Sequence, residues 1–262
     1  MSSADIKILF FGDLVGKPGR FAVRDYLAQN KKMRPDFVIA NVENASHGFG
    51  LTEKNYNELL GYGINCMTSG NHIWDKKDIF NYIDSADKLI RPFNYPEGVP
   101  GAGSGIFEAG GVKIAVINIL GQVFMNLINS PWQGAVEEIK RLKEITPIVI
   151  VDFHAEATAE KLCFARHCSE LGVSAFFGTH THVQTADETI INNMAYITDA
   201  GFCGAADGII GMDYKTSSSR FTTGLPERHE VAAGASVITN AVEVEIKPDT
   251  GYAVKIRRVK PL

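Results

Sequence analysis

The stretch that decides the fold is Ile6-Lys7-Ile8-Leu9-Phe10-Phe11-Gly12-Asp13, an apolar run that ends in a glycine and a carboxylate. The run is rich in β-forming residues, too short for a buried helix, and bounded by a turn residue, so it predicts a buried strand. Runs of the same kind recur at residues 37–40, 64–68, 112–118, 148–152 and 175–177. The sequence therefore predicts a sheet of buried strands.

Amphipathic segments lie between these strands. Apolar side chains recur at helical spacing over residues 20–32, 52–60, 76–83, 133–144 and 157–171. Thr52 is suited to cap the start of its helix, and Gly61 and Gly172 are suited to end helices. Strands that alternate with helices predict an α/β fold in which helices pack on the sheet.

The C-terminal region has a different pattern. Residues 235–240, 241–247 and 252–259 alternate apolar and polar side chains and are separated by turn signals, which predicts a β-hairpin or meander. Residues 201–230 are rich in Gly, Ser and Thr, and we expect a long ordered loop or flap there, close to a site. Without repeats or a linker, one domain over residues 1–262 is the simplest interpretation.

Composition limits the classes of function. The chain has 262 residues and a formal net charge of −4, so no global positive field favours nucleic acid or an anionic membrane, although a local basic patch stays open. No apolar run approaches the roughly 20 residues that cross a bilayer, and the N-terminus lacks the features of a signal peptide. The four cysteines form no C-x-x-C pair, which predicts a cytoplasmic protein with reduced thiols.

Side chains that bind metals follow five of the predicted strands. Because ligands of α/β sheets bind outside the carboxyl ends of the strands, we expect these side chains to meet at one rim. Gly12, Gly70 and Gly178 precede some of them and would let the backbone approach an ion or phosphate closely. The candidate ligands are Asp13, Glu43, Asn71, His154, His180 and His182.

This set of residue types indicates two metal ions. Carboxylate and amide oxygens suit hard divalent cations, and imidazoles suit Zn, Fe or Mn. About six such ligands are more than one catalytic ion needs, and two ions roughly 3.5–4 Å apart can activate a bridging hydroxide that attacks phosphorus. Each side chain alone could be a turn residue or a buried histidine, and the pair in His180-Thr181-His182 is a weak signal by itself. The full set is specific because it needs five independent coincidences.

The motifs resemble those of calcineurin-like metallophosphoesterases, and most closely those of the YmdB-like phosphodiesterase branch. Asp13 lacks the histidine that usually follows two positions later, and Glu43-Asn44 stands where a bridging aspartate is usual. Both departures are shared with the YmdB-like branch. The resemblance covers nearly the whole chain and is carried by residues 12–20, 40–45, 70–75, 152–158 and 178–187.

The resemblance implies a calcineurin-like metallophosphoesterase sandwich, with mixed central sheets flanked by helices. It also implies roles for the residues of the site. Glu43 would bridge the two ions, and His72 would be the general acid that protonates the leaving oxygen, because histidine exchanges protons near neutral pH. Asp152 and Glu156 are candidates to orient a ligand histidine. One ion would be completed by Asp13, Asn44 and His182, and the other by Asn71, His154 and His180.

The implied activity is hydrolysis of cyclic nucleotides, with 2′,3′-cyclic AMP-type substrates foremost, by attack of a metal-bridging hydroxide. Fe or Mn is the expected metal, with Zn as an alternative. Two rival functions stay open: a phosphomonoesterase or nucleotidase with the same metal centre, and a low-turnover regulatory protein that responds to nucleotides. The sequence does not fix the metal, the physiological substrate, the substrate-binding residues or homo-oligomer formation.

Overall fold

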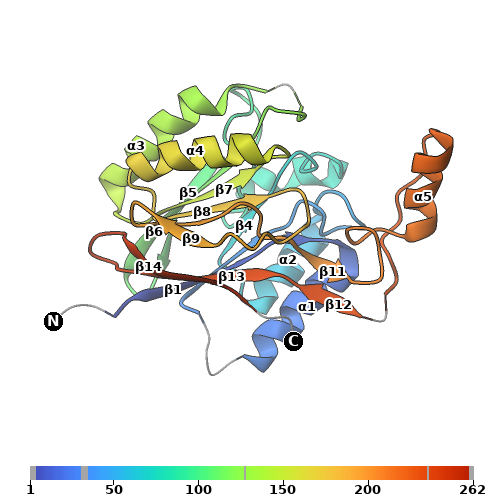
Figure 1. The fold of residues 1–262 in the computed structure, drawn as a ribbon, viewed down its shortest axis with the longest axis horizontal. Helices are drawn as coiled ribbons and strands as arrows, with labels where there is room; N and C mark the ends of the chain where they lie inside the picture. The colour runs from blue at the N-terminus through green and yellow to red at the C-terminus, as the bar shows by residue number, and fades with distance from the viewer. Residues whose placement is uncertain (1–3, 31–34, 127, 235, 260–262) are drawn as a thin grey trace.

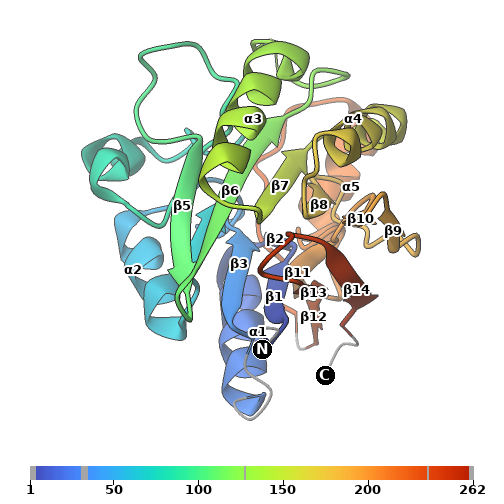
Figure 2. The same cartoon turned by 90° about the vertical axis from the view of Figure 1, so that its left-hand side faces the viewer.

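A computed structural model describes residues 4–30, 35–126, 128–234 and 236–259. Two mixed sheets pack face to face, and helices cover both outer faces (Figures 1 and 2). The predicted sandwich of mixed sheets flanked by helices is therefore confirmed. That the whole chain is one domain stays a prediction.

The first sheet has five strands in the order β14-β13-β1-β3-β4. β1, β3 and β4 run parallel, whereas β13 pairs antiparallel with β1 and forms a hairpin with β14. The C-terminal hairpin is thus confirmed, and it completes the sheet that the N-terminal strand begins. The strands are β1 (Ile6–Phe11), β3 (Phe37–Asn41), β4 (Cys66–Thr68), β13 (Ala241–Ile246) and β14 (Ala253–Arg258).

The second sheet has six strands in the order β5-β6-β7-β8-β10-β9, with a parallel centre and antiparallel edges. A small third sheet, in the order β12-β11-β2, lies beside the first. The six strands are β5 (Ser104–Ala109), β6 (Val112–Leu120), β7 (Val149–His154), β8 (Ala175–Thr179), β9 (Thr189–Ile191) and β10 (Met194–Ile197). The strands of the small third sheet are β2 (Asp13–Leu14), β11 (Phe202–Ala205) and β12 (Val237–Thr239).

Alternation along β1 explains how one strand contributes to two layers of core. Successive side chains of a strand point to opposite faces of the sheet. Ile8 and Phe10 enter the core between the sheets, where Phe10 stacks on Phe177 of β8 with ring centroids 4.4 Å apart. Leu9 and Phe11 instead pack with the helices on the outer face. Strand β1 is therefore apolar on both faces, as expected of a parallel strand that is covered on each side.

Four helices cover the sheets. α1 (Gly16–Gln29) packs on β11 and β12 of the small sheet and reaches Phe11 of β1 through Tyr26. α2 (Glu53–Tyr62) lies on the five-stranded sheet, and α3 (Val136–Ile145) and α4 (Thr158–Glu170) lie on the six-stranded sheet (Figure 2). As predicted, Thr52 caps α2 by accepting a hydrogen bond from the Asn55 backbone N–H. Among the described residues, none of the helices is long and apolar enough to span a bilayer.

The structure corrects several predicted elements. Gly61 lies inside α2, which ends at Gly63 with φ 92°, whereas Gly172 does follow the end of α4. Residues 76–83 form only the short 3₁₀ turns η2 (Lys77–Asn81) and η3 (Ile83–Ser85). The predicted helix at 133–144 begins in the structure with a π-helical turn, η4 (Pro131–Ala135), and continues directly as α3 from Val136. Residues 31, 32 and 235, the ends of a predicted helix and a predicted strand, lie outside the described residues.

Residues 201–230 are not a plain loop. They contain β11 and α5 (Tyr214–Thr223), and α5 projects from the body of the protein (Figure 1). The helix is rich in Ser and Thr, which are weak helix formers, so its periodicity is poor. The residues at its two ends do mark the helix: Asp213 caps its start by accepting a hydrogen bond from the Thr216 N–H, and Gly224 ends it with φ 69°.

Three of the four cysteines are buried: Cys66, Cys168 and Cys203, called the buried thiols below, while Cys163 is exposed. None of the four is in a disulfide. Burial raises the pKa of each buried thiol above its ordinary value. A thiol that stays protonated behaves as a small apolar side chain, so these cysteines serve packing.

Candidate metal centre and catalytic pocket

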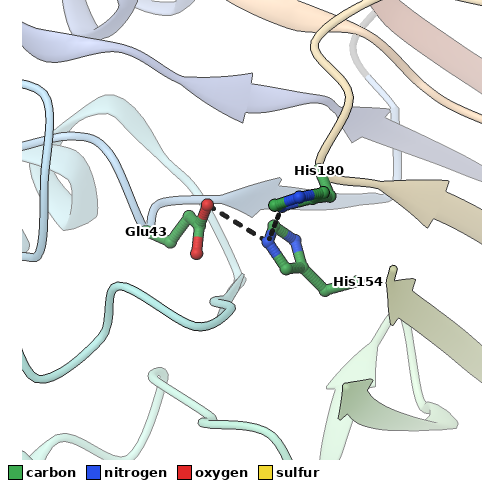
Figure 3. A group of neighbouring side chains, drawn as sticks. All are labelled: Glu43, His154 and His180. Carbon is green, nitrogen blue, oxygen red and sulfur yellow. Dashed lines mark hydrogen bonds and ion pairs between the residues drawn. The ribbon is translucent and has the colours of Figure 1, made fainter. Parts of the chain in front are cut away.

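The predicted ligands come from the carboxyl ends of strands in both large sheets. Asp13 follows β1, the Glu43-Asn44 pair follows β3, and Asn71 follows β4. His154 is the last residue of β7, and His180 and His182 lie in the turn after β8. Because the two sheets are packed face to face, these ends meet at one rim, and the side chains of Glu43, His154 and His180 point toward one another (Figure 3).

Three potential ligand atoms surround one nitrogen of His154. Glu43 Oε1, Asn71 Oδ1 and His180 Nδ1 each lie 3.1 Å from His154 Nε2. A single ring proton cannot satisfy three neighbours, whereas one shared cation would bind all four atoms. This convergence is the first sign that the residues fit a metal ion.

A second group shares Glu43. Ligand atoms of Asp13, Glu43 and His182 lie within 4.8 Å of one another, and so do those of Glu43, His154 and His180. Asp13 Oδ1 and Asn44 Oδ1 are buried and have no hydrogen-bond partner among the described residues. Buried oxygens without partners are costly, and a bound cation would satisfy them. Six of the seven predicted ligands thus lie in two groups joined at Glu43, and Asn44 adds an unpartnered oxygen from the residue next to Glu43. This donor set fits two divalent ions.

Burial and mutual charge shift the pKa values of the site. Burial would raise the pKa of Glu43, but the adjacent His154 lowers it to about 2. Burial would lower the pKa of His154, but Glu43 raises it to about 9. Burial and the nearby His154 lower the pKa of His180 to about 3, and burial raises that of Asp13 well above its ordinary value. The shifts reflect carboxylates and imidazoles crowded in a water-poor site, where a cation is the natural counter-charge.

Hydrogen bonds orient two of the candidate ligand histidines. The Thr179 hydroxyl donates to Asp152 Oδ1 at 2.7 Å, so it accepts from His154 Nδ1 at 2.9 Å and leaves Nε2 facing the site. His182 Nδ1 lies 2.9 Å from the Ile210 carbonyl, an arrangement in which Nδ1–H donates and Nε2 is left as the ligand. Asp152 therefore contacts His154 indirectly, through the Thr179 hydroxyl. Glu156 contacts His180 directly, with Oε2 3.1 Å from Nε2.

His180 and His182 lie in a turn with an unusual backbone. β8 ends at Thr179, and both histidines have positive φ, 103° and 61°. Such a backbone costs about 1–3 kcal/mol per residue and needs support from its surroundings. Asp199 provides it, because Oδ2 accepts hydrogen bonds from the backbone N–H and the hydroxyl of Thr181 at 3.1 and 2.8 Å.

Asp199 is itself held by a buried lysine. Lys161 Nζ of α4 lies 2.7 Å from Asp199 Oδ2, and both side chains are 1% exposed. The Gly201 N–H donates to the other carboxylate oxygen at 2.9 Å. Sequence reasoning missed both residues, although Asp199 repeats the pattern of an acidic residue shortly after a strand, here β10. A lysine in a helix gives no comparable sequence signal.

His72 lies beside the ligand groups. Its backbone N–H donates to Glu43 Oε2 at 3.1 Å, and its Nδ1 lies 2.8 Å from Asp75 Oδ2. The Asp75 contact orients the ring and leaves Nε2 available. Phe49 packs against the ring with centroids 4.6 Å apart. His72 is thus a fixed imidazole at the edge of the metal centre.

A pocket of about 670 Å³ opens over these residues. Glu43, His180 and His182 lie at its inner end, together with His72. Gly70 lies next to the ligands, since a Cβ there would come within 2.3 Å of Glu43 Oε2 and 2.4 Å of His154. Sequence reasoning gave no role to some residues that line the pocket, among them Phe49, Arg220 and His229.

Known proteins resemble this chain over nearly its whole length. The "2',3'-cyclic-nucleotide 2'-phosphodiesterase" of Bacillus subtilis (strain 168) is 47% identical over 256 residues, which are 97% of this chain and 96% of the relative. The crystal structure of a novel phosphatase from Mycoplasma pneumoniae has a TM-score of 0.91 at 36% identity, covering 99% of this chain and 94% of that one. A hypothetical protein from Thermus thermophilus has a TM-score of 0.88 at 35% identity, covering 97% and 98%.

The fold and these likenesses define a class: the chain is a phosphoric diester hydrolase with the metallophosphoesterase fold. That fold implies divalent metal ions. A family model described as "YmdB-like protein" matches residues 9–259. The chain belongs to this YmdB-like family, as the motifs indicated.

Proposed function

We propose that this protein hydrolyses cyclic nucleotides, with 2′,3′-cyclic AMP-type substrates foremost, and uses two divalent metal ions. The observation that carries the proposal is the pair of ligand groups that share Glu43 beside His72. The substrate class is supported by the name of the Bacillus subtilis relative, a "2',3'-cyclic-nucleotide 2'-phosphodiesterase" at 47% identity. Fe or Mn is the proposed metal, with Zn as the alternative.

In this proposal Glu43 would hold both ions. Asp13, Asn44 and His182 would complete one site, and Asn71, His154 and His180 would complete the other. When bound, the ions supply Lewis acidity, which activates water as a nucleophile and neutralises charge on the phosphoryl group. The chain holds the ligands rigidly, because Thr179 and Asp152 fix the ring of His154, and Asp199 fixes the turn that carries His180 and His182.

His72 is proposed as the proton donor to the leaving oxygen. Its Nδ1 contacts Asp75, so Nε2 is the atom that would give a proton to the ribose oxygen that leaves phosphorus. The Asp75 carboxylate keeps the ring aligned before and after the transfer. Opening of a 2′,3′-cyclic phosphate at the 2′ oxygen would leave a 3′-nucleotide.

Two measurements on the purified protein test the proposal. Hydrolysis of bis-p-nitrophenyl phosphate is compared with hydrolysis of p-nitrophenyl phosphate; turnover of the monoester alone would overturn the proposed activity. Metal analysis after anaerobic purification without chelator should find two equivalents of Fe, Mn or Zn per chain. Finding none would overturn the metal centre.

The His72→Ala variant tests the role of the proton donor. We expect metal content to stay at the wild-type value while the rate falls by roughly 10²–10⁴. Loss of metal from this variant would instead place His72 among the ligands. Chromatography of the products from 2′,3′-cyclic AMP should show 3′-AMP.

A further inference from the structure

A second cavity adjoins the catalytic pocket. It has a volume of about 450 Å³ and is lined by residues that include Lys17, His47 and Arg228; we call it the outer cavity. His229 lines both the outer cavity and the catalytic pocket, so the two meet at this side chain. The outer cavity is therefore adjacent to the catalytic pocket, within reach of a ligand that extends past His229.

The two cavities differ in charge. The inner one is lined by three carboxylates, those of Glu43, Asp75 and Glu156, and among the described residues by one guanidinium, that of Arg220. The outer one has the cations Lys17 and Arg228, and Glu230 is its single carboxylate among the described residues. A charge distribution of this kind suits metal ions at the inner end and an anion, with no metal, at the outer end.

The two outer cations have no carboxylate partner. Arg20, Arg257 and Arg258 each form an ion pair with a carboxylate. Among the described residues neither Lys17 nor Arg228 forms such a pair, and Lys17 only lies over the ring of Phe21 at 5.0 Å. Unpaired cations that face a cavity are available to a phosphate, which takes charge-assisted hydrogen bonds from both side-chain types.

Aromatic rings connect the two cavities. Phe49 lies between His72 and His229, with centroids 4.6 Å from the first ring and 5.5 Å from the second. His229 lines the outer cavity, so these contacts link His72 to that cavity through Phe49. Aromatic side chains beside a basic groove are the usual means of binding single-stranded nucleic acid, because every base has a face that can stack.

We propose that the outer cavity binds the phosphodiester next to a terminal 2′,3′-cyclic phosphate, so that the preferred substrate is the 3′ end of a single-stranded RNA. The inference rests on the proposed function, which places the cyclic phosphate at the metal ions. RNA is specified because a 2′,3′-cyclic phosphate requires the ribose 2′ oxygen. The net charge of −4 does not oppose this binding, since charges beyond about 8–10 Å are screened at physiological salt.

The test compares two substrates of the metal-loaded enzyme: 2′,3′-cyclic AMP and a short oligoadenylate that ends in a 2′,3′-cyclic phosphate. We expect kcat/KM for the oligonucleotide to be larger by about tenfold at low salt and to fall as salt rises, because phosphate contacts release counterions. In the double variant Lys17→Ala/Arg228→Ala the ratio of the two kcat/KM values should fall toward one. Lys54→Ala/Lys215→Ala removes two exposed lysines that line neither cavity and should keep the wild-type ratio.

A binding measurement separates this inference from the proposed function. Fluorescence anisotropy of an oligoadenylate with a 3′-phosphate, the expected product, reports the outer cavity without turnover. Tighter binding of the oligonucleotide than of 3′-AMP, lost in the Lys17/Arg228 variant, supports the inference even if cyclic AMP is not hydrolysed. Equal kcat/KM values for both substrates, or a preference that survives in the double variant, overturn it and leave the proposed function standing.

Discussion

Replacing Lys161 by methionine should destabilise the protein by about 3–5 kcal/mol, because it leaves a buried carboxylate without its counter-charge. Lys161 Nζ and Asp199 Oδ2 are 2.7 Å apart and both side chains are 1% exposed, so solvent does not screen the pair. Methionine keeps most of the apolar stem and removes only the charge. For a chain of this size the loss corresponds to a fall in Tm of roughly 6–20 °C.

Unfolding in urea with chelator present measures this effect without a contribution from metal binding. Lys255→Met is the matched control, because its ion pair with Glu245 spans 3.1 Å but the two side chains are 52% and 22% exposed. Exposed pairs contribute about 0–1 kcal/mol. Adding Asp199→Asn to the Lys161 variant should restore part of the stability, since the remaining carboxylate charge is removed.

Loss of Lys161 should also weaken metal binding, because Asp199 would no longer hold Thr181 between the two ligand histidines. Metal titration followed by calorimetry should give a weaker affinity for the Lys161 variant than for the Lys255 control. A loss of less than about 1 kcal/mol on the Lys161→Met change would refute the reasoning, since it would mean that the pair behaves like a surface ion pair.

Three further predictions concern the site and the core. Gly70→Ala should abolish metal retention, measured by elemental analysis, because the new Cβ would lie 2.3 Å from Glu43 Oε2. Gly61→Ala in α2 is the control: its Cβ would meet nothing within 4 Å, so the variant should be as stable as the wild type or more stable by up to about 1 kcal/mol. Asp75→Asn should lower kcat about tenfold at unchanged metal content, because it removes the charge that aligns His72; an unchanged kcat would contradict the role of the pair. Burial raises the pKa of the buried thiols, so they ionise at lower pH in the unfolded chain than in the folded protein. The free energy of unfolding should therefore fall as pH rises above about 8.5, by up to about 4 kcal/mol per pH unit for the three thiols together. Urea unfolding at pH 7.5 and 9.5 should show this fall, and a variant with alanine at all three positions should show a smaller one.

The sequence predicts the parts of this fold that depend on local pattern. β1 was predicted with the bounds that the structure gives it, because its residues are apolar on both faces and a glycine follows them. The candidate ligands could be named for a related reason, since each follows a buried strand whose end must lie at the rim. The hairpin of β13 and β14 was visible from period-two alternation, but nothing local shows that β13 pairs with β1 across the length of the chain.

What the sequence does not predict depends on contacts between distant residues. Lys161 and Asp199 are 38 positions apart, and neither suggests the other. The positive φ of His180 and His182 arises from support by Asp199, while histidine itself favours no such backbone. Two nearby glycines, Gly61 and Gly63, could each end α2, and only the tertiary structure selects the second.

The origin of the ligands from two sheets has a consequence for biosynthesis. Asp13, Glu43 and Asn71 are synthesised more than a hundred residues before His180 and His182. The edge of β1 that β3 leaves free is covered by β13, residues Ala241–Ile246, which is made later still. A nascent chain that ends before β8 therefore carries only part of the proposed ligand set, with its carboxylates unprotected. Binding of the full proposed set of ions should follow the pairing of β13 with β1, and should mark the chains that have folded correctly.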